Sequence, residues 1–544
     1  MTLVALFAFL MLGSVGSAGP SHVVNVPKFE VNMVVAHLGA ESYFDTTISG
    51  IGGPEEGYSV WDGTWIGWCV DEYHYIYPGT TYPITLNSTY DPLMLWPDDD
   101  WDMVNYLVNH KGSADKVQIQ EAIWYFINGG YTGTDSVILG MITEAGTNGD
   151  GFVPQEGQMC AVLCTTDEGI QKTFIEVPVP ATPCVVYVDD DYNHLTSGWG
   201  FDHFDNIQDG VDAVCDGGTV IVYDGTYDTF KVEGRNDITI TMGSLPVISG
   251  NQLVYDITYP GFVNNVVFVN NSQNIDLIGF EIQGTNPGGR DYTVLYQNSS
   301  GMIKDCVVSP GNRGNMYALA VRAHVNSTLT IESCTIQDYG RIGIYCRQGT
   351  TLYIYNNTLI GQMYSTADGD YVNYGIEIED LSYKSHAVIR GNEIYGHDYT
   401  DNPSWSSAGI IVDAWRYYMV TDENCSAIIE QNDIHDNYFG IEIVPNDDIH
   451  VNCNNIYDNR WYGAISSPYY DGMQYVNYTL DANCNWWGDC SGPYNDTLNP
   501  YGQGDQVDDY VDFNPWVGIV VADAGGPYNI EDVPTVHFDG SGSS

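Results

Sequence analysis

The sequence predicts a mainly β protein whose central part is a solenoid of short stacked strands. Its strongest sign is a repeat of an apolar residue, two variable residues, Cys or Asn, one variable residue and a second apolar residue. The shortest distance between copies is 22 residues, a period typical of solenoid coils that leaves no room for a helix between the strands. The abundance of glycine (59 residues) and tyrosine (42 residues) is typical of strands joined by many turns. Copies of the repeat begin at Ile303, Ile331, Ile354, Ile389, Ile429 and Val451.

The overall charge excludes several classes of function. Acidic residues number 71 against 16 basic ones, which gives a net charge of −55 at pH 7. A chain this negative repels nucleic acids and anionic membrane surfaces, so we expect neither as a partner. Hydrophobic residues make up 44% of the chain and aromatic residues 13%. This content predicts a folded protein and not a disordered acidic one.

Residues 1–18 are typical of a secretory signal peptide. Residues 3 to 12 are almost wholly apolar, and the small residues Gly16, Ser17 and Ala18 follow them. The apolar stretch is shorter than the roughly 20 residues of a membrane span, and no later stretch is long enough, so we expect no direct membrane insertion. The sequence therefore predicts a secreted, extracellular protein associated with a cell surface.

Sequons and cysteines agree with an exterior location. Asn-x-Ser/Thr is the acceptor pattern for N-glycosylation, and cysteines pair in oxidising compartments. Two cysteine pairs are candidates for disulfides, Cys184 with Cys215 and Cys484 with Cys490. The candidate glycosylation sites are Asn87, Asn270, Asn298, Asn326, Asn356, Asn424, Asn477 and Asn495.

The first domain, residues 19–183, mixes alternating strands with two helical segments. WDMVNYLVNHK (Trp101–Lys111) is typical of a helix with Asp100 as its cap. DKVQIQEAIWYFIN (Asp115–Asn128) has apolar residues on related turns and predicts a second helix that ends at Gly129. The Pro-rich stretch EVPVPATPC at 176–184 then marks a domain boundary.

The Cys/Asn position of the repeat predicts a ladder along one corner of the second domain, residues 184–516. An inward Asn at a tight corner can bond its own coil and the Asn of the next coil, about 4.8 Å away. A Cys fits the same position as a small buried residue, so we expect the two cysteines of the column in the core and not in a disulfide. Phe280 is an earlier and Asn483 a later occupant. The column contains Cys306, Cys334, Asn357, Asn392, Asn432 and Asn454.

This second domain resembles the right-handed parallel β-helix surface proteins of archaea and bacteria. Its start, VVYVDDDYNHLTSGWGFDHFDNIQDGVDAVCDGGTVIVYDGTYD (185–228), is similar to the first coil of those proteins, where an amphipathic helix, here about Asn206–Cys215, caps the open end. CNWWGDCSGPY (484–494) is similar to their closing motif. The resemblance implies a right-handed parallel β-helix of about nine coils.

The last segment, residues 517–544, resembles the beginning of a PKD domain, an immunoglobulin-like sandwich. The similarity lies in ADAGGPYNIEDVPTVHFDGSGSS (522–544). So short a segment cannot bury a core of its own, and we expect the sequence to stop inside this domain.

Two short motifs of the first domain resemble those of the thioester domains of bacterial surface adhesins. GWCVD (67–71) matches the aromatic-Cys-aliphatic-acidic context of the family, and IQEAIW (119–124) matches its Thr-Gln-x-Ala motif, with Ile119 in place of the usual Thr. The resemblance implies that Cys69 is the thiol and Gln120 the acyl donor of an internal thioester.

Such a thioester is a latent electrophile. A thiol held against an amide displaces ammonia because fixed geometry raises the effective concentration, and an incoming surface amine then attacks the acyl-sulfur bond to give a permanent amide. The alternative is that Cys69 is a buried thiol, or one half of a disulfide with Cys160 or Cys164, and that Gln120 is an ordinary helix residue.

The solenoid strands also carry charged columns that we expect to face outward. In the motif GIxIx the two apolar positions face inward, so the alternate residues point away from the core. Arg347, Glu379 and Asp413 then share one column, and Glu377 and Glu442, separated by Ile411, share the next. Such an exposed row can bind a sugar chain or Ca²⁺, or supply the acid and base of a polysaccharide lyase or glycosidase. The alternative is ordinary solvated surface. The carbohydrate-contact candidates are Glu377, Glu442, Trp415, Arg416 and Tyr417.

Together these features predict a secreted cell-surface modular protein of adhesin-like or surface-structural type. Its β-helix would be a spacer that contacts carbohydrate, and its thioester would attach it covalently. A secreted polysaccharide lyase or glycosidase and a surface-layer or sheath component are the alternatives. The expected partners are cell-surface glycans or polysaccharide and a surface amine nucleophile. No cofactor is required, and Ca²⁺ is a candidate ligand for the runs 98–100 and 189–191 of consecutive Asp residues.

Overall fold

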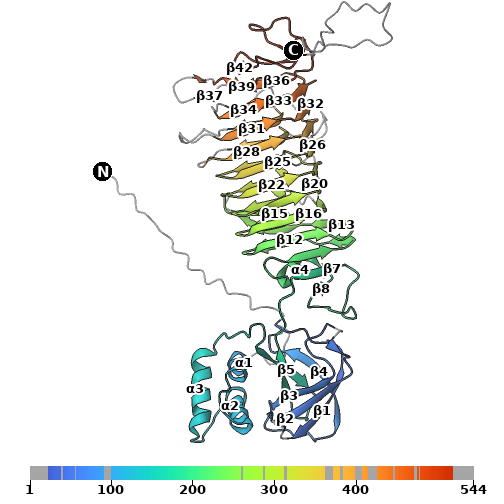
Figure 1. Ribbon diagram of the computed structural model, residues 1–544, viewed down its shortest axis with the longest axis vertical. Helices are drawn as coiled ribbons and strands as arrows, with labels where there is room; N and C mark the ends of the chain where they lie inside the picture. The colour runs from blue at the N-terminus through green and yellow to red at the C-terminus, as the bar shows by residue number, and fades with distance from the viewer. Residues whose placement is uncertain are drawn as a thin grey trace, which may run out of the picture. The chain divides into compact units, whose positions relative to one another are not determined.

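The chain folds into two compact units (Figure 1). The first contains the chain up to Pro183 together with Asp191–Phe204, and the second contains Cys184–Asp190 and the chain from Asp205 onward. The predicted signal peptide and residues 519–544 of the PKD-like segment lie outside the described residues. The structure, a computed structural model, describes residues 23–37, 39, 41–54, 57–90, 100–258, 261–285, 288–311, 315, 317–361, 372–379, 384–398, 407–413, 425–444, 448–467, 469–470, 475–476 and 478–518.

A closed antiparallel barrel forms the first unit, with the strand order β1-β2-β3-β6-β5-β4. Alternate residues of its strands face a buried core, as the strict alternation along β4 shows. The barrel strands are β1 (Val31–His37), β2 (Phe44–Ser49), β3 (Gly63–Cys69), β4 (Thr81–Ser88), β5 (Met159–Thr165) and β6 (Thr173–Pro178). Unit 1 also contains the short strand β8 (His203–Phe204).

Three helices of this unit lie together beside the barrel (Figure 1): α1 (Trp101–Asn109), α2 (Lys116–Asn128) and α3 (Ser136–Asn148). Helix α2 agrees with the prediction: Asp115 caps it, and it ends before Gly129. Asp100 is the N-cap residue of α1, as predicted, but its side chain makes no capping hydrogen bond. Helix α3 was not predicted, because its β-branched start, SVI, favours a strand. The helices share a core with Trp68 and Phe174 of the barrel.

The second unit is a parallel β-helix, which confirms the predicted solenoid. Each full coil contributes one strand to each of three parallel sheets, and the strands stack in register along the axis (Figure 1). Ile303, Ile331 and Ile354, for example, are direct neighbours in successive coils, and all three are fully buried. The repeated motif of the sequence is therefore one column of the core.

Sheets 1, 2 and 3 follow one another around each coil. Sheet 1 contains β7 (Val185–Val188), β9 (Thr219–Val222), β12 (Asn236–Met242), β16 (Gln273–Ile278), β19 (Ser300–Lys304), β22 (Thr328–Glu332), β25 (Thr351–Tyr355), β28 (His386–Arg390), β31 (Ser426–Glu430), β34 (Ile449–Asn452), β39 (Leu480–Asp481) and β42 (Val511–Asp512). Sheet 2 contains β10 (Gly225–Tyr227), β13 (Pro246–Gly250), β17 (Glu281–Gly284), β20 (Val307–Ser309), β23 (Thr335–Ile336), β26 (Thr358–Ile360), β29 (Glu393–Tyr395), β32 (Asp433–His435) and β35 (Asn455–Tyr457).

Sheet 3 differs from the other two because an antiparallel strand, β14 (Gln252–Asp256), extends it beside β15. Its parallel strands are β11 (Phe230–Glu233), β15 (Gly261–Asn270), β18 (Asp291–Gln297), β21 (Ala318–His324), β24 (Ile342–Arg347), β27 (Tyr374–Glu379), β30 (Ala408–Asp413), β33 (Phe439–Ile443) and β36 (Tyr462–Ser466). Two small pairs lie outside the three sheets: β37 (Tyr469–Tyr470) with β38 (Tyr475–Val476), and β40 (Pro493–Tyr494) with β41 (Gly504–Gln506).

The Asn column lies at the corner between sheets 1 and 2 and forms a hydrogen-bonded ladder. The backbone N–H of Asn392 donates to Oδ1 of Asn432 (3.0 Å), and the N–H of Asn432 donates to Oδ1 of Asn454 (3.0 Å). Asn454 in turn donates to Asn485 (2.8 Å). The seventh occupant is Asn485 and not the predicted Asn483, because the chain makes a turn there instead of a full repeat. Cys306 and Cys334 are buried and free.

The other two corners carry polar columns that the sequence analysis missed. Between sheets 2 and 3, the backbone N–H groups of His397, Asn437 and Asn459 donate to Asn437, Asn459 and Asp505 (3.0–3.1 Å). Between sheets 3 and 1, Ser272 donates through its N–H to Oγ of Ser299 (3.2 Å). Every corner of the coil thus has side chains that satisfy buried backbone donors.

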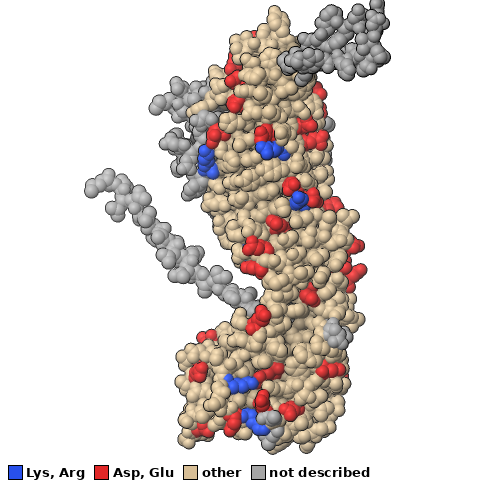
Figure 2. Space-filling view, in the orientation of Figure 1, with Lys and Arg blue, Asp and Glu red and all other residues tan. Residues whose placement is uncertain are grey.

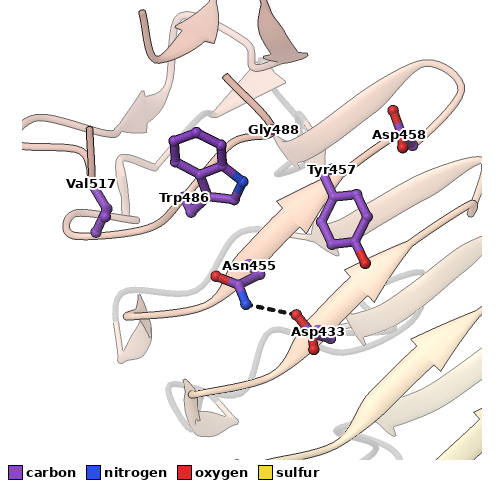
Figure 3. A pocket seen from close by; sticks show the side chains of 7 residues that line it. All are labelled: Asp433, Asn455, Tyr457, Asp458, Trp486, Gly488 and Val517. Carbon is purple, nitrogen blue, oxygen red and sulfur yellow. Dashed lines mark hydrogen bonds between the residues drawn. The ribbon is translucent and has the colours of Figure 1, made fainter. Parts of the chain in front are cut away.

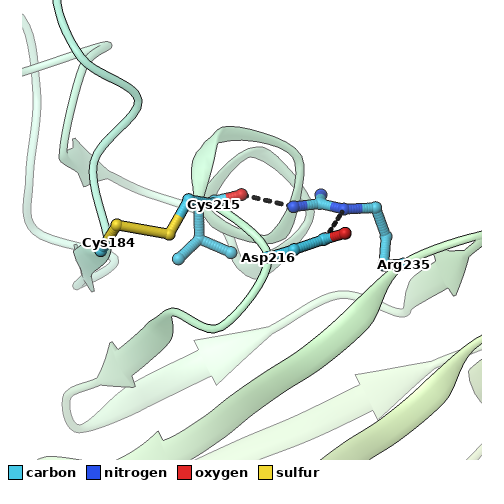
Figure 4. The surroundings of a disulfide bond; sticks show 5 residues. Cys184, Cys215, Asp216 and Arg235 are labelled. Atoms are coloured by element: carbon cyan, nitrogen blue, oxygen red, sulfur yellow. Dashed lines mark hydrogen bonds and ion pairs between the residues drawn. A yellow bond between two sulfur atoms is a disulfide. The ribbon is translucent and has the colours of Figure 1, made fainter.

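A short helix, α4 (Ile207–Ala213), covers the first coil and agrees with the predicted cap. Its N-cap is Asn206, whose side chain accepts from the N–H of Asp209 (2.9 Å). The disulfide Cys184–Cys215 joins the chain after the helix to the start of β7, and Arg235 bonds Asp216 beside it (Figure 4). This disulfide was predicted. The other predicted pair is wrong, since Cys484 and Cys490 are exposed free thiols.

The surface agrees with the acidic composition, and only a few basic side chains appear among the acidic ones (Figure 2). Among the sequons, Asn298, Asn326 and Asn356 are exposed, whereas Asn87 and Asn270 are half-buried. Asn495 is buried and its Nδ2 donates to the carbonyl of Val507 (3.2 Å), so its prediction as a glycan site is corrected. Asn424 and Asn477 lie outside the described residues. No helix of the described chain is long and apolar enough to cross a membrane.

Candidate functional site

Cys69 is the last residue of β3 and lies fully buried between the barrel and the helices of the first unit. Helix α2 brings Gln120 against it. The amide of Gln120 bonds the backbone of Cys69 twice: its Nε2 donates to the Cys69 carbonyl, and its Oε1 accepts from the Cys69 N–H, both at 2.8 Å. Gln120 therefore holds the main chain of the cysteine and is not aimed at the sulfur.

The amide that lies against the thiol belongs to Gln171. Its Nε2 is 2.7 Å from Sγ of Cys69 and also donates to the carbonyl of Asp71 (2.7 Å). Gln171 precedes β6, which pairs with β3 so that Cys69 is opposite Thr173. The amide in contact with the sulfur is thus that of Gln171, a residue that the sequence analysis missed, and not that of Gln120, the acyl donor implied by the resemblance. The pairing that brings it there joins segments 102 residues apart.

The thiol is kept protonated and away from solvent. Burial raises the pKa of the Cys69 thiol to about 12, although Trp124 and the backbone of Asp71 act to lower it. Trp124 packs edge-to-face on Tyr43, with their ring centroids 5.8 Å apart. Cys160 and Cys164 are separate buried free thiols, so the predicted alternative of a disulfide with Cys69 does not occur in the structure.

In the second unit, the charged columns of sheet 3 have the predicted register. Arg347 is opposite Glu379, which is opposite the backbone of Asp413. Ile411 separates Glu377 from Glu442 in the neighbouring column.

The predicted exposure of these columns is wrong. Arg347 is 3% exposed, Glu377 and Glu379 are 5% exposed and Glu442 is 8% exposed. An apolar cluster on the outer face of sheet 3 packs around them, with Val254 of β14 and Tyr374 of β27 among its members. The side chain of Asp413 and the residues Trp415, Arg416 and Tyr417 lie outside the described residues.

The outer face of sheet 3 contains a cavity of about 240 Å³. Charged and aromatic groups line it together. Its lining includes Glu377 and Glu379 from the predicted set, and Arg290, Tyr292, Arg322, Arg341 and Tyr345, which the sequence analysis did not single out. Three of the nine arginines of the chain are among them. In so acidic a protein, this is a marked local concentration of positive charge.

Arg322 is the centre of this cluster and is fully buried. Its Nη1 is 3.0 Å from Oδ2 of Asp256, and its guanidinium lies over the rings of Tyr292 (4.4 Å) and Tyr345 (5.3 Å). Burial acts to raise the pKa of Asp256, but Arg322 and His324 hold it below its usual value. Burial and the charge of Arg322 lower the pKa of His324 well below its usual value, so its imidazole is neutral at pH 7.

The two buried glutamates of the cavity differ in their surroundings. Glu379 accepts from the hydroxyl of Tyr345 and forms an ion pair with Arg347 (3.6 Å). Oε2 of Glu377 accepts no hydrogen bond from the described residues, and burial raises the pKa of Glu377 against the opposing charges of nearby arginines. One carboxylate thus has a hydroxyl donor and a cationic partner, while the other is biased toward its acid form, and two carboxyl groups in different surroundings suit acid–base chemistry.

Comparisons with known proteins support the fold of the second unit. A family model described as the right handed beta helix region matches residues 265–413 and 326–483. The second unit is therefore a right-handed parallel β-helix. No curated protein matches the chain.

Several solved structures are similar to parts of this chain. The A-module of mannuronan C-5 epimerase AlgE4 from Azotobacter vinelandii has 14% identity and a TM-score of 0.35, over 56% of this chain and 90% of that chain. ORF18 of Geobacillus virus E2 has 12% identity and a TM-score of 0.35, over 67% and 70%. The N-terminal thioester domain of fibronectin-binding protein SfbI from Streptococcus pyogenes has 13% identity and a TM-score of 0.19, over 29% and 95%.

Proposed function

We propose that the first unit forms an internal thioester between Cys69 and Gln171, and that this bond attaches the protein covalently to an amine on a partner surface. The observation that carries the proposal is the contact of 2.7 Å between Nε2 of Gln171 and Sγ of Cys69 inside a buried site. A thiol and an amide in fixed contact react as if at a very high concentration, on the order of 10⁵ M in well-oriented cases.

The chemistry balances without a further reagent. The sulfur of Cys69 attacks the side-chain carbonyl carbon of Gln171, the C–N bond breaks, and the thiol proton leaves with the nitrogen as ammonia. A primary amine of the partner then attacks the same carbonyl carbon. The C–S bond breaks, the thiol of Cys69 is restored with a proton from the amine, and an amide joins the partner to Gln171.

Gln120 has a positioning role in this proposal. Its two hydrogen bonds to the backbone of Cys69 fix the end of β3 and therefore the direction of the thiol. The placement of both motifs in one buried site supports the resemblance to the thioester domains of surface adhesins. An adhesin-like, secreted protein with its head at residues 19–183 and its β-helix at 184–516 is the arrangement that we propose.

Intact-mass spectrometry of the purified protein tests the thioester directly. We expect a mass that is lower than calculated by one ammonia, and a gain of one methylamine on the acyl group after incubation with methylamine. Cys69→Ala and Gln171→Ala should each show their full calculated masses and no reaction with methylamine. Gln120→Ala should form less thioester, and Gln155→Ala, which removes an exposed glutamine of the same unit, is the matched control. A wild-type mass equal to the calculated one, with Cys69 titrating as a free thiol, would exclude the bond.

A second function is supported by the cavity of sheet 3, where we propose carbohydrate binding or processing. The specific observation is that Glu377, whose pKa is raised, lines the same cavity as Glu379, which forms an ion pair with Arg347, beside further arginines and tyrosines. Arginines suit the carboxylates of an acidic polysaccharide, and the two glutamates suit acid and base roles. The test is turnover or binding of polygalacturonate and alginate. Activity that survives Glu377→Gln and Glu379→Gln unchanged would remove this site from consideration.

A further inference from the structure

A column of aromatic rings follows the outer face of sheet 2 through three successive coils. Tyr395 of β29, His435 of β32 and Tyr457 of β35 occupy the same register position. The rings of Tyr395 and His435 stack with centroids 5.2 Å apart and an angle of 3° between their planes. The rings of His435 and Tyr457 stack at 4.9 Å and 16°. Each ring face inside the column is therefore covered by its neighbour.

The column ends at Gly488, which takes the next position along the axis. Asn455 is bridged to Trp486 in the following coil, so Gly488 is the register neighbour of Tyr457. Gly488 has a φ of +92°, and a Cβ at this position would be 3.1 Å from the Cβ of Tyr457. Because no side chain extends from Gly488, one face of the Tyr457 ring borders an open pocket of about 550 Å³ (Figure 3).

The pocket combines apolar walls with polar groups. Trp486 and Val517 line it beside Tyr457, and Asp433 and Asn455 line it from the preceding coils (Figure 3). Nδ2 of Asn455 donates to Oδ1 of Asp433 (2.7 Å), so each of these side chains is oriented by the other. Oδ2 of Asp433 and Oδ1 of Asn455 are acceptors for further donors, such as sugar hydroxyls.

The wall residue Trp486 is held by the backbone of the β-helix. The backbone N–H of Trp486 donates to the carbonyl of Asn454 (2.8 Å), and the backbone carbonyl of Trp486 accepts from the N–H of Ile456 (2.8 Å). The residues of the pocket thus come from consecutive coils of one solenoid, and backbone hydrogen bonds between the coils hold Trp486 in place. Such preorganisation reduces the free-energy cost of binding.

We propose that this pocket binds a neutral pyranose unit of a glycan, with the apolar face of the sugar on the open face of Tyr457 and against Trp486. The sugar ring would then continue the aromatic column at the position that Gly488 leaves empty. Hydroxyls at the ring edge would donate to Asp433 and Asn455. The charge of the lining selects a neutral ligand, because Asp433 and Asp458 are acidic and none of the described lining residues is Lys or Arg. This site is separate from the cavity on sheet 3 and from Cys69.

Isothermal titration calorimetry on the full chain tests the proposal. The probes are the neutral oligosaccharides cellohexaose, maltohexaose and mannohexaose, with trigalacturonate as the anionic comparison. We expect at least one neutral probe to bind, and we expect any binding of trigalacturonate, which suits the arginines of the sheet 3 cavity, to be unchanged in Trp486→Ala. Trp486→Ala and Tyr457→Ala should each weaken binding of the neutral probe by at least about tenfold.

The matched control is Trp461→Ala, which removes another tryptophan of the β-helix that is 53% exposed but lies outside the pocket. It should bind as the wild type does. Asp433→Asn keeps the shape of the side chain and should weaken binding without loss of fold, which covers the case in which an aromatic variant does not fold. The proposal is overturned if no neutral probe binds, if Trp486→Ala and Asp433→Asn both bind that probe like the wild type, or if Trp486→Ala weakens trigalacturonate binding as much as it weakens binding of the neutral probe.

Discussion

Truncation of one rung of the Asn ladder is the sharpest test of how the β-helix is held together. The side chain of Asn432 is 1% exposed and bonds both neighbouring coils. Its Oδ1 accepts from the N–H of Asn392 (3.0 Å), and its Nδ2 donates to the carbonyl of Ile389 (2.9 Å) and to Oδ1 of Asn454 (2.9 Å). Asn432→Ala leaves these three buried groups without those bonds. At about 1 kcal/mol or more for each, the expected loss is about 3 kcal/mol.

Hydrogen exchange followed by mass spectrometry measures this loss locally, which suits a solenoid whose coils need not unfold together. A loss of about 3 kcal/mol corresponds to exchange faster by roughly two orders of magnitude. The effect should appear in peptides that cover residues 389–395 and be much weaker in those of β22, two coils earlier. Asn455→Ala is the control, because that side chain is exposed and has one side-chain bond, to Asp433. A change below about fivefold at 389–395, or one equal to that of the control, would refute the ladder as a source of stability.

Three further predictions concern pH and the disulfide. Burial lowers the pKa of His397 to about 4, so as the pH falls the unfolded chain binds a proton at this histidine before the folded chain does. The free energy of unfolding of the wild type, measured by urea melts, should therefore fall between about pH 6.5 and pH 4 more steeply than that of His397→Asn. Burial raises the pKa of Asp505 to about 6, so the wild type loses stability as the pH rises from about 4 to 6. Asp505→Asn still offers an oxygen to the N–H of Asn459 and should be more stable than the wild type at about pH 8. Equal midpoints of urea unfolding at that pH would contradict this. Cys184→Ser opens a disulfide that spans 31 residues and should lower the stability of the capped end by about 3–4 kcal/mol, seen as faster exchange in α4 and β9 but not in β34.

The parts of the fold that could be predicted from sequence are those in which a local pattern repeats. The Asn column shows itself because one residue type recurs at a fixed place between two apolar positions. The second corner column is equally regular in space, but its four occupants, His397, Asn437, Asn459 and Asp505, are of three residue types, so the sequence shows no long repeat there. Helix α2 was recognisable from its cap and its glycine stop, whereas α3 was hidden by a β-branched start.

The candidate sites show where local patterns do not suffice. Strand alternation correctly predicted that Glu377 and Glu379 point away from the solenoid core, but pointing outward does not mean exposure. Their burial depends on contacts between distant segments, since the apolar cluster on the outer face of sheet 3 joins residues from Val254 to Phe439. Gln171 was missed for the same reason, because only the pairing of β3 with β6 places it at Cys69. In both cases, the information lies in the tertiary fold and not in any window of sequence.

The buried charges on sheet 3 are not needed to build the β-helix. The apolar columns inside the solenoid and the polar columns at its three corners already join each coil to the next, and an apolar outer face would stack equally well. Ion pairs such as Arg322 with Asp256 rarely add stability over apolar residues of similar size, because their desolvation offsets their attraction. Glu377 strengthens the argument that these charges do not serve stability. Its buried carboxyl has one oxygen without a hydrogen bond among the described residues, which destabilises the fold in the absence of a ligand. Charges that folding does not require, set around a cavity, are best explained by what enters that cavity.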